Sequence, residues 1–185
     1  DPVRTVVLSG ELRLAFQQYF VRDRCEPPVS GFSFEGVSAA RPNRKVMTLL
    51  QDAAFSTVVI CPSNPFVSVD PILQVPGLWL ALRDNIAPVV LVSPIVAGQA
   101  IKGPTAKMMA ELQVPVTALG VAQHYVARYP GLVDYFVIDE SDAKLASQIS
   151  ELGLRVVIGS TVMTSREDKQ QLAHLCLQTG SAGPR

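Results

Sequence analysis

The sequence has few of the residues that mark disulfide-rich, metal-binding or charge-driven proteins. Its 185 residues include two histidines and three cysteines. The cysteines Cys25, Cys61 and Cys176 are odd in number, widely spaced and without a CxxC pair, which disfavours a disulfide framework and a zinc site. Basic and acidic side chains number 16 each, so no net charge draws the protein to nucleic acid or to an anionic membrane.

Long apolar runs are also missing. Pro, Ser or charge interrupts each run well before the roughly 20 residues that a bilayer span requires. No basic-then-apolar leader opens the chain. We therefore expect a cytoplasmic protein. The chain begins Asp1-Pro2-Val3, without an initiator Met and directly in strand-like sequence, and we expect it to be a piece of something longer.

Several catalytic signatures are absent from the sequence. It has no nucleophile elbow, no histidine-based triad pattern and no paired-carboxylate motif. The lack of a GxGxxG after a strand disfavours a generic NAD-binding Rossmann protein. His124 and His174 have no partner at metal-ligand spacing, so we interpret both as structural or surface residues.

The sequence does contain a regular alternation of strand-like and helix-like segments. Its 48% hydrophobic and 17% charged residues are typical of a globular domain with a sizeable core. Strands are expected at residues 57–60, 89–92, 133–138 and 155–158, with helices between them and a last helix at 166–178. This pattern predicts an α/β, Rossmann-like fold, with a mostly parallel sheet and helices on both faces.

Three regions are expected along the chain. Residues 1–41 should form a strand pair and a linking segment, residues 42–178 the α/β nucleotide-binding region, and residues 179–185 a flexible tail. The last helix is expected to be capped by Thr164 or Ser165.

Two of the expected strands run into polar loops, in the segments TVVICPSNPFVSVD (57–70) and VVLVSPIVAGQAIKGP (89–104). Ligands in open α/β sheets bind at the carboxyl ends of the strands, so we expect the two loops to form a phosphate-binding crevice. The expected binding residues are Ser63, Asn64, Ser68, Asp70, Ser93, Gly98, Lys102 and Gly103.

The expected chemistry of this crevice rests on two short motifs. Ser63 and Asn64 offer a hydroxyl and an amide just past the strand, although a capping Ser and an Asx turn explain them equally well. Two glycines and Lys102 before a helix supply the backbone donors and positive charge of a phosphate cradle, but not with the Walker spacing. Lys102 is the one candidate for charge stabilisation, and other catalytic residues and metal ligands stay unassigned.

An acidic group surrounds the third expected strand, on what we take to be the crevice side. Its members are Asp134, Asp139, Glu140 and Asp142. These carboxylates would suit a cation, but such a group more often caps the following helix, and we favour capping.

Longer blocks of the sequence resemble a known family. They are PSNPFVSVDPILQVPG, VSPIVAGQAIKGPTAKMMAELQV, ALGVAQHY, LVDYFVIDE and STVMTS. Their order and intervals resemble the 2-phospho-L-lactate transferase family (CofD type) of coenzyme F-420 biosynthesis. The segments DPVRT and EPPVSGFSFEGVSAA are similar to the middle of that family, so the resemblance covers nearly the whole chain.

The resemblance implies transfer of a phospholactyl or phosphoenolpyruvyl group from a guanosine diphosphate donor (LPPG or EPPG) to the deazaflavin alcohol Fo. GMP would be released, and Mg²⁺ would be required. The loops at Ser63-Asn64 and Lys102-Gly103 would bind the GDP end of the donor. A homodimer is compatible with the family, whereas nucleic-acid and membrane partners are not expected.

Part of the family pattern is missing from this sequence. The family opens with a glycine-rich GGTG-type loop and has acceptor-binding and acidic metal-binding residues in its first half. We therefore expect this chain to be the carboxyl-terminal part of such an enzyme, inactive alone. The alternative is a non-catalytic regulator that binds nucleotide sugars, of the gluconeogenesis-factor (YvcK-like) group, but the SPIVAGQAIKGP block followed by LGVAQHY favours the transferase.

Overall fold

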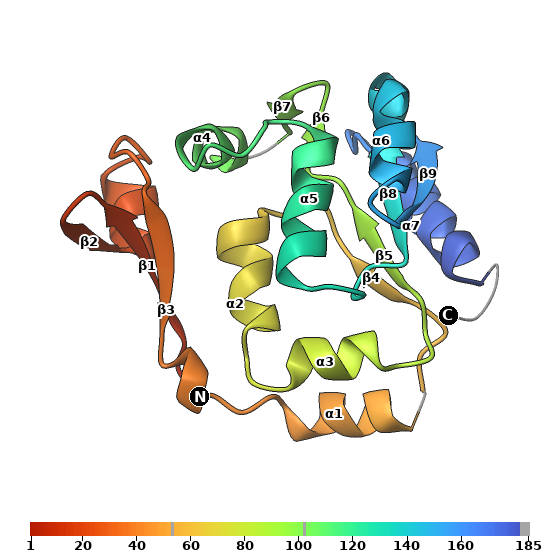
Figure 1. Cartoon of the computed structure of the whole chain (residues 1–185), viewed down its shortest axis with the longest axis horizontal. Helices are drawn as coiled ribbons and strands as arrows, with labels where there is room; N and C mark the ends of the chain where they lie inside the picture. The colour runs from red at the N-terminus through yellow and green to blue at the C-terminus, as the bar shows by residue number, and fades with distance from the viewer. Residues whose placement is uncertain (53, 102, 182–185) are drawn as a thin grey trace.

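A four-stranded parallel sheet forms the centre of the α/β part (Figure 1). The computed structural model describes residues 1–52, 54–101 and 103–181. The sheet has the order β4-β5-β8-β9, and its strands are β4 (Val58–Ile60), β5 (Val89–Val92), β8 (Tyr135–Asp139) and β9 (Arg155–Gly159). The predicted α/β class and parallel sheet are confirmed, with each strand close to its expected place.

The two central strands are apolar because both of their faces are covered. Every residue of β5 and β8 is buried, as expected for strands inside a parallel sheet. On one face, Leu91 and Phe136 join a large core with Val121 and Tyr125 of α5 (Ala118–Arg128). On the other face, Val92 and its neighbours pack against α7 (Arg166–Ser181).

The helices are distributed unequally between the two faces. Strands that pair in chain order through right-handed crossovers place their connecting helices on one side of the sheet. The connecting helices are α2 (Asp70–Leu73), α3 (Leu78–Arg83), α4 (Thr105–Glu111), α5 and α6 (Ala146–Ser150). Helix α7 contacts β5, β8 and β9 from the back (Figure 1).

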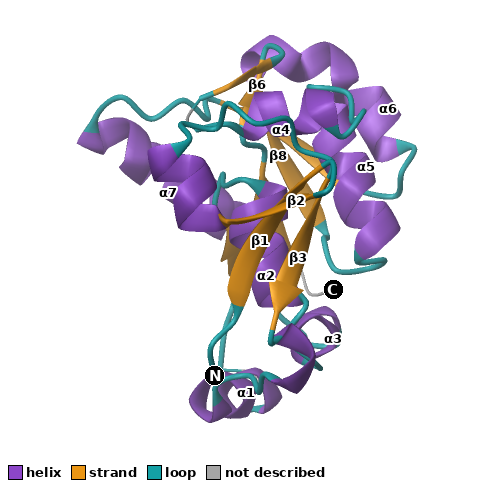
Figure 2. Ribbon diagram, turned by 90° about the vertical axis from the view of Figure 1, so that its left-hand side faces the viewer, coloured by secondary structure: helices purple, strands orange, loops and turns teal. Residues whose placement is uncertain are grey.

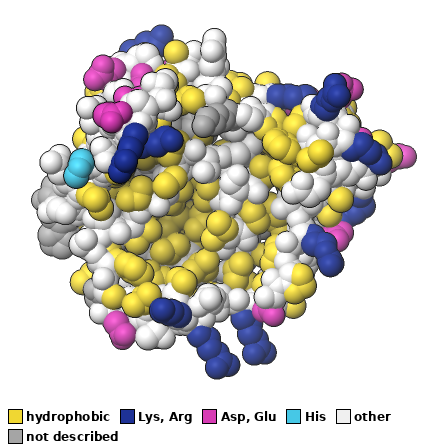
Figure 3. Space-filling view, turned by 180° about the vertical axis from the view of Figure 1, so that it is seen from behind, with side chains coloured by type: hydrophobic (Ala, Val, Ile, Leu, Met, Phe, Trp, Pro, Cys, Tyr) yellow, Lys and Arg dark blue, Asp and Glu magenta, His cyan; other side chains and the backbone are white. Residues whose placement is uncertain are grey.

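The back of the molecule carries exposed apolar side chains (Figure 3). An apolar groove of about 320 Å³ runs between β4 and α7. Val59, Cys61 and Leu177 are among its lining residues, and the Val59 side chain is 36% exposed. The face that α7 covers is therefore only partly closed.

The amino-terminal region forms a separate antiparallel sheet of three strands, which Figure 2 turns toward the viewer. Its order is β2-β1-β3, and its strands are β1 (Arg4–Ser9), β2 (Leu12–Ala15) and β3 (Gly31–Glu35). The aromatic segment after β2 forms a π-helical turn (Gln18–Arg22). Glu111 of α4 accepts from the Val29 N–H at 3.0 Å and ties this region to the α/β part.

Several helices begin where the sequence supplies a cap. Asn43 accepts from the Lys45 N–H at 2.9 Å at the start of α1 (Arg44–Gln51), and Thr117 accepts from the Gly120 N–H at 3.1 Å at the start of α5. Gly77 has φ +82° at the start of α3, a left-handed conformation that glycine adopts without strain.

Other parts of the chain differ from the predicted pattern. The second polar loop contains a short hairpin of β6 (Ile95–Val96) and β7 (Gln99–Ala100). A 3-10 helix (Glu140–Leu145) precedes α6, so the segment between β8 and β9 is not a single α-helix. Helix α7 continues three residues beyond 178, because Gly180 packs directly on Thr57; the rest of the expected tail lies outside the described residues.

The two histidines are a structural and a surface residue, as interpreted from the sequence. The His124 ring packs edge-on against Phe66, and His174 is exposed on α7. Cys25, Cys61 and Cys176 are free. None of the described helices combines the length and apolar character that crossing a membrane demands.

Gly120 tests the close contact at the start of α5. A Cβ there would overlap the Pro115 carbonyl oxygen, which is backbone and cannot rotate away. Gly120→Ala should therefore lower the free energy of unfolding by about 1–3 kcal/mol, measured by urea denaturation. Gln123→Ala, at an exposed position of the same helix, is the control and should change it little. Equal stability of the two variants would contradict this packing.

Candidate functional site

A cavity of about 190 Å³ lies at the carboxyl ends of the parallel strands. We call it the strand-end cavity. Loops after β4, β5 and β9 and the starts of α4 and α7 surround it. Its lining residues are Pro62, Ser63, Asn64, Pro94, Ile101, Thr105, Thr161, Met163 and Lys169. The loops after β4 and β5 are the two that the sequence singled out.

A second cavity, of about 430 Å³, adjoins the first. We call it the aromatic cavity. It lies between the π-helical turn of the amino-terminal region and the loops after β4 and before α4. Its lining residues are Phe16, Phe20, Pro62, Ser63, Asn64, Val67, Ser68, Gly103, Pro104 and Thr105. Pro62, Ser63, Asn64 and Thr105 line both cavities and form their common wall.

Four of the predicted site residues meet at these cavities. Ser63 and Asn64 line both, and Ser68 and Gly103 line the aromatic cavity. Lys102 falls outside the described residues. Ser93, Gly98 and Asp70 are not among the residues that line either cavity.

Asn64 acts as a cap. Its Oδ1 accepts from the N–H groups of Phe66 at 2.9 Å and Val67 at 3.2 Å, and its Nδ2 donates to Met108 Sδ at 3.2 Å. Its amide therefore shapes the loop after β4, which is the capping alternative left open above. The neighbouring Ser63 is presented to the two cavities by that loop.

Ser93 and Gly98 shape the loop after β5. The Ser93 hydroxyl is fully buried; it donates to the Ile95 carbonyl oxygen at 2.8 Å and accepts from the Ile95 N–H at 3.2 Å. Gly98 has φ +76° at the turn of the β6–β7 hairpin. The Ala97 N–H donates to Asp142 at 3.0 Å, which attaches this hairpin to the 3-10 helix after β8.

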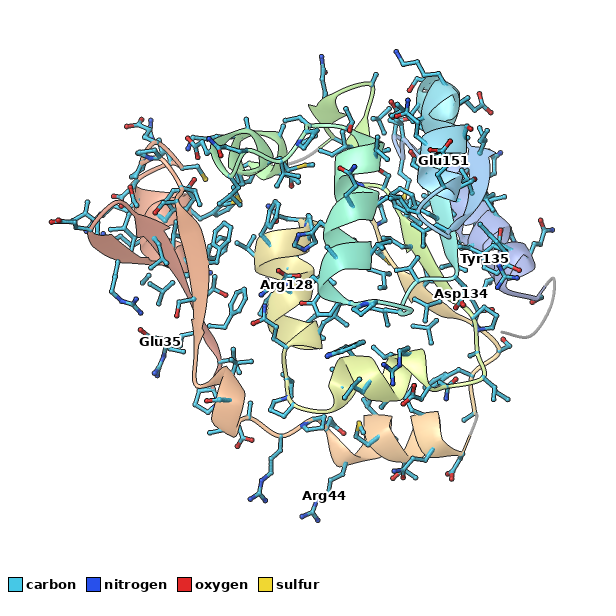
Figure 4. The ribbon with its side chains drawn as sticks, viewed as in Figure 1. Glu35, Arg44, Arg128, Asp134, Tyr135 and Glu151 are labelled. Carbon is cyan, nitrogen blue, oxygen red and sulfur yellow. The ribbon has the colours of Figure 1, made fainter. Side chains whose placement is uncertain are left out.

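Asp70 belongs to a buried network between α2 and α5. Its Oδ1 accepts from the Tyr129 hydroxyl at 3.0 Å and lies 3.1 Å from His124 Nε2, while its Oδ2 lies 3.2 Å from Arg128 Nε. Arg128 is labelled beside α2 in Figure 4. Burial, and then the Asp70 charge, raise the pKa of Tyr129 to about 12, so its hydroxyl remains a donor. Asp70 thus fastens α2 to α5.

Asp139 joins the loops that follow β8 and β9. Its Oδ1 accepts from the Ser141 N–H at 3.1 Å and hydroxyl at 2.7 Å, and its Oδ2 from the Thr161 N–H at 3.0 Å and hydroxyl at 3.2 Å. Burial opposes ionisation, but these donors outweigh it and hold the pKa of Asp139 below its usual value. The carboxylate therefore positions Thr161 at the strand-end cavity.

The acidic group of the sequence does not converge on one point. Asp139 caps the 3-10 helix, as favoured, but Asp134 lies at the amino end of β8, away from the cavities (Figure 4). The expectation that Asp134 is on the crevice side is wrong; it accepts from the Val89 N–H at 2.7 Å. Across the described residues, no three His, Cys, Asp or Glu side chains are grouped to hold a metal ion.

Lys169, Thr161, Met163 and Thr105 line the strand-end cavity but were not singled out from the sequence. Lys169 lies in the first turn of α7, where Ser165 caps the helix by accepting from the Asp168 N–H at 3.1 Å. Bonds from Thr164 and Ser165 lower the pKa of Asp168 to about 2. The STVMTS block, noted only as part of the family resemblance, was the signal that pointed to this region.

The electrostatic character of the strand-end cavity favours an anion. Lys169 is exposed and makes no ion pair with another described residue. The described lining of both cavities includes Ser and Thr hydroxyls but no carboxylate. Among the described lining residues, a phosphate placed there would meet the positive charge of Lys169 and hydroxyl donors, and no acidic side chain would repel it.

The profile of the family described as 2-phospho-L-lactate transferase CofD matches residues 1–172. The chain belongs to this family. The 2-phospho-L-lactate transferase of Methanosarcina barkeri is 35% identical over 175 residues, which is 95% of this chain and 54% of the relative. The phosphoenolpyruvate transferase of Mycobacterium ulcerans is 39% identical over 128 residues, which is 69% of this chain and 38% of the relative.

This CofD-family chain spans about half the length of the curated relatives that it matches over most of its own length. Solved structures agree on the fold. A crystal structure of a UPF0052-family protein from Bacillus halodurans aligns with a TM-score of 0.63 at 14% identity, covering 94% of this chain and 58% of that one. A second crystal structure of the Bacillus halodurans protein gives a TM-score of 0.65 at 13% identity.

The hydrogen bonds by which Asp139 joins the loops after β8 and β9 should stabilise the fold in a pH-dependent way. The stabilising effect of Asp139 should be present above the ordinary carboxyl pKa of about 4 and be lost as pH falls through its lower folded value. Asp139→Asn places an NH₂ group against the N–H and hydroxyl donors of Ser141 or Thr161. It should therefore lower the free energy of unfolding by about 2 kcal/mol at pH 7. Urea denaturation at pH 7 and pH 3 measures the difference in the free energy of unfolding between the unchanged chain and Asp139→Asn. This difference should be smaller at pH 3. Glu140→Gln, at the exposed neighbour, is the control; the same pH dependence there would refute the assignment.

Proposed function

We propose that this chain forms the donor-binding part of a CofD-type transferase of coenzyme F-420 biosynthesis. The reaction moves a phospholactyl or phosphoenolpyruvyl group from a guanosine diphosphate donor to the deazaflavin alcohol Fo, with release of GMP. Family membership supports the type of reaction. The observation that carries the proposal is the strand-end cavity, whose described lining has Lys169 and hydroxyl side chains and no carboxylate.

The chemistry requires an alcohol to attack phosphorus. The Fo hydroxyl oxygen forms a new bond to the phosphorus that carries the organic acid, and the bond from that phosphorus to the bridging oxygen breaks. GMP leaves with the electron pair, and the hydroxyl proton is released. Negative charge grows on the leaving phosphate, so a positioned cation and hydrogen-bond donors supply catalysis.

The residues have different roles in this proposal. Lys169 neutralises charge on the diphosphate, and Ser63 and Thr105 donate at the wall that both cavities share. Asp139 holds Thr161 in place by accepting from its N–H and its hydroxyl, and it accepts two more hydrogen bonds from Ser141. Lys102, which lies outside the described residues, stays in the proposal as a candidate for charge stabilisation.

The described residues do not fit a magnesium site by themselves. Mg²⁺ in phosphoryl-transfer sites is usually held by one or two carboxylates as well as by phosphate oxygens. The described lining of both cavities has no Asp or Glu, and the Asp139 oxygens already accept from Ser141 and Thr161. No step above therefore depends on the metal.

Lys169→Gln tests the donor site. Removing a charge-assisted contact to the diphosphate should weaken GDP binding by about tenfold, measured by isothermal titration calorimetry. Lys144→Gln removes an exposed lysine on the 3-10 helix, away from both cavities, and should leave the GDP dissociation constant unchanged.

The same titration, repeated with UDP-glucose, distinguishes the transferase from the nucleotide-sugar-binding regulator. A transferase of this type should bind GDP more tightly than UDP-glucose, whereas a regulator of the gluconeogenesis-factor group should prefer the UDP-sugar. Tighter binding of UDP-glucose, or equal loss of GDP affinity in the two lysine variants, would count against the proposal.

A further inference from the structure

A separate cavity, of about 330 Å³, lies where the end of α2, the turn into α3 and the carboxyl end of α5 meet. We call it the α2–α3 pocket. Gln74, Trp79, Arg128 and Tyr129 are among its lining residues. Within the described part of the chain, it shares no lining residue with the strand-end cavity or the aromatic cavity. Its volume is within the range of small-molecule sites.

Arg128 brings a positive charge to this pocket, beside α2 (Figure 4). Its Nε lies 3.2 Å from Asp70 Oδ2, and its side chain is 48% exposed. The described residues place no carboxylate other than Asp70 within ion-pair distance of the guanidinium. A guanidinium carries five N–H donors in a planar fork. Arg128 can therefore hold Asp70 through Nε and still donate to a second anion through its terminal nitrogens.

Gln74 adds an amide donor to the same pocket. It follows the last residue of α2 and lines the pocket directly. Its Nε2 atom is buried and has no hydrogen-bond partner among the described residues. A buried donor without a partner is unfavourable, and an acceptor oxygen of a ligand would satisfy it.

Trp79 supplies an aromatic wall. Its ring packs edge-on against Tyr129, with centroids 5.9 Å apart and planes 61° apart. The guanidinium of Arg83, which is ion-paired with Asp84, lies 5.3 Å from the centre of the Trp79 ring. The described lining of the pocket contains no Asp or Glu. Positive charge, an amide donor and an aromatic surface thus meet at one cavity.

We propose that the α2–α3 pocket is a second ligand site, which binds a small organic acid with a flat body. Arg128 and Gln74 donate to the carboxylate, and the body of the acid lies against Trp79. One guanidinium that is shared with Asp70 suits a single negative charge better than a doubly charged phosphate. The aromatic wall favours an organic ligand over an inorganic anion. The site is independent of the proposed transfer reaction.

Fluorescence offers a direct test, because Trp79 is the only tryptophan in the sequence. Benzoate is the probe, and benzamide has the same ring without the charge. Benzoate should change the Trp79 fluorescence in a saturable way, and benzamide should bind about tenfold more weakly. Inorganic phosphate is the third ligand. Tighter binding of phosphate than of benzoate would overturn the assignment to an organic acid.

Gln74→Glu tests the location of the site. It replaces the amide donor with a negative charge beside Arg128, so it should weaken benzoate binding by about tenfold. Gln123→Glu adds the same charge at an exposed position of α5 that does not line the pocket, and should leave the dissociation constant unchanged. Circular dichroism melting shows whether each variant is folded. If Gln74→Glu does not fold, Gln74→Met replaces it, and should weaken binding by about threefold because only the donor is lost.

A competition experiment separates this site from the proposed donor site. Lys169→Gln should leave benzoate binding unchanged, and GDP should not displace benzoate. The inference is overturned if GDP displaces benzoate, if benzoate gives no saturable change, or if the folded Gln74 variant binds benzoate as Gln123→Glu does. If benzoate binds as expected but GDP does not bind, the α2–α3 pocket stands and the proposed donor site falls.

Discussion

The burial of β5 and β8 determines where polar groups are placed in the α/β part. Every residue of both strands is covered, so neither strand offers a side chain to a ligand along its length. Polar residues appear only where the strands end, and parallel strands end at the same side of the sheet. The strand-end cavity is a direct result of this packing, with Ser63, Pro94 and Thr161 brought together from three loops.

This packing explains what the sequence predicted well. The strands were recognisable because buried parallel strands are short runs of β-branched and aromatic residues, and their abrupt change to Pro, Ser and Asn marked the loops. Ser63 was placed at a cavity for that reason. Asn64 was ambiguous, because capping and ligand binding both use an amide oxygen, and only the contacts with Phe66 and Val67 decide between them.

The cavity residues that the sequence did not predict reach the cavity only through the tertiary structure. Lys169 and Thr161 are about a hundred residues from the loop after β4 in sequence, and it is α7, folded back along the sheet, that brings Lys169 to the cavity. Asp70 follows the same loop closely in sequence, yet the π-helical turn Pro65–Val69 directs it to Tyr129 and His124. Phe16 and Phe20 line the aromatic cavity from the amino-terminal region, and no local pattern in the sequence could place that region beside the loops after β4 and before α4.

The outer strand β4 has a consequence for work in solution. In the part of the chain that the structure describes, β4 pairs with β5 alone, and the half-open groove of Val59 and Leu177 lies beside it. A bare strand edge next to apolar surface is a template on which other chains add strands. Concentrated samples therefore favour aggregation along β4, and dilute solutions give the most faithful affinities.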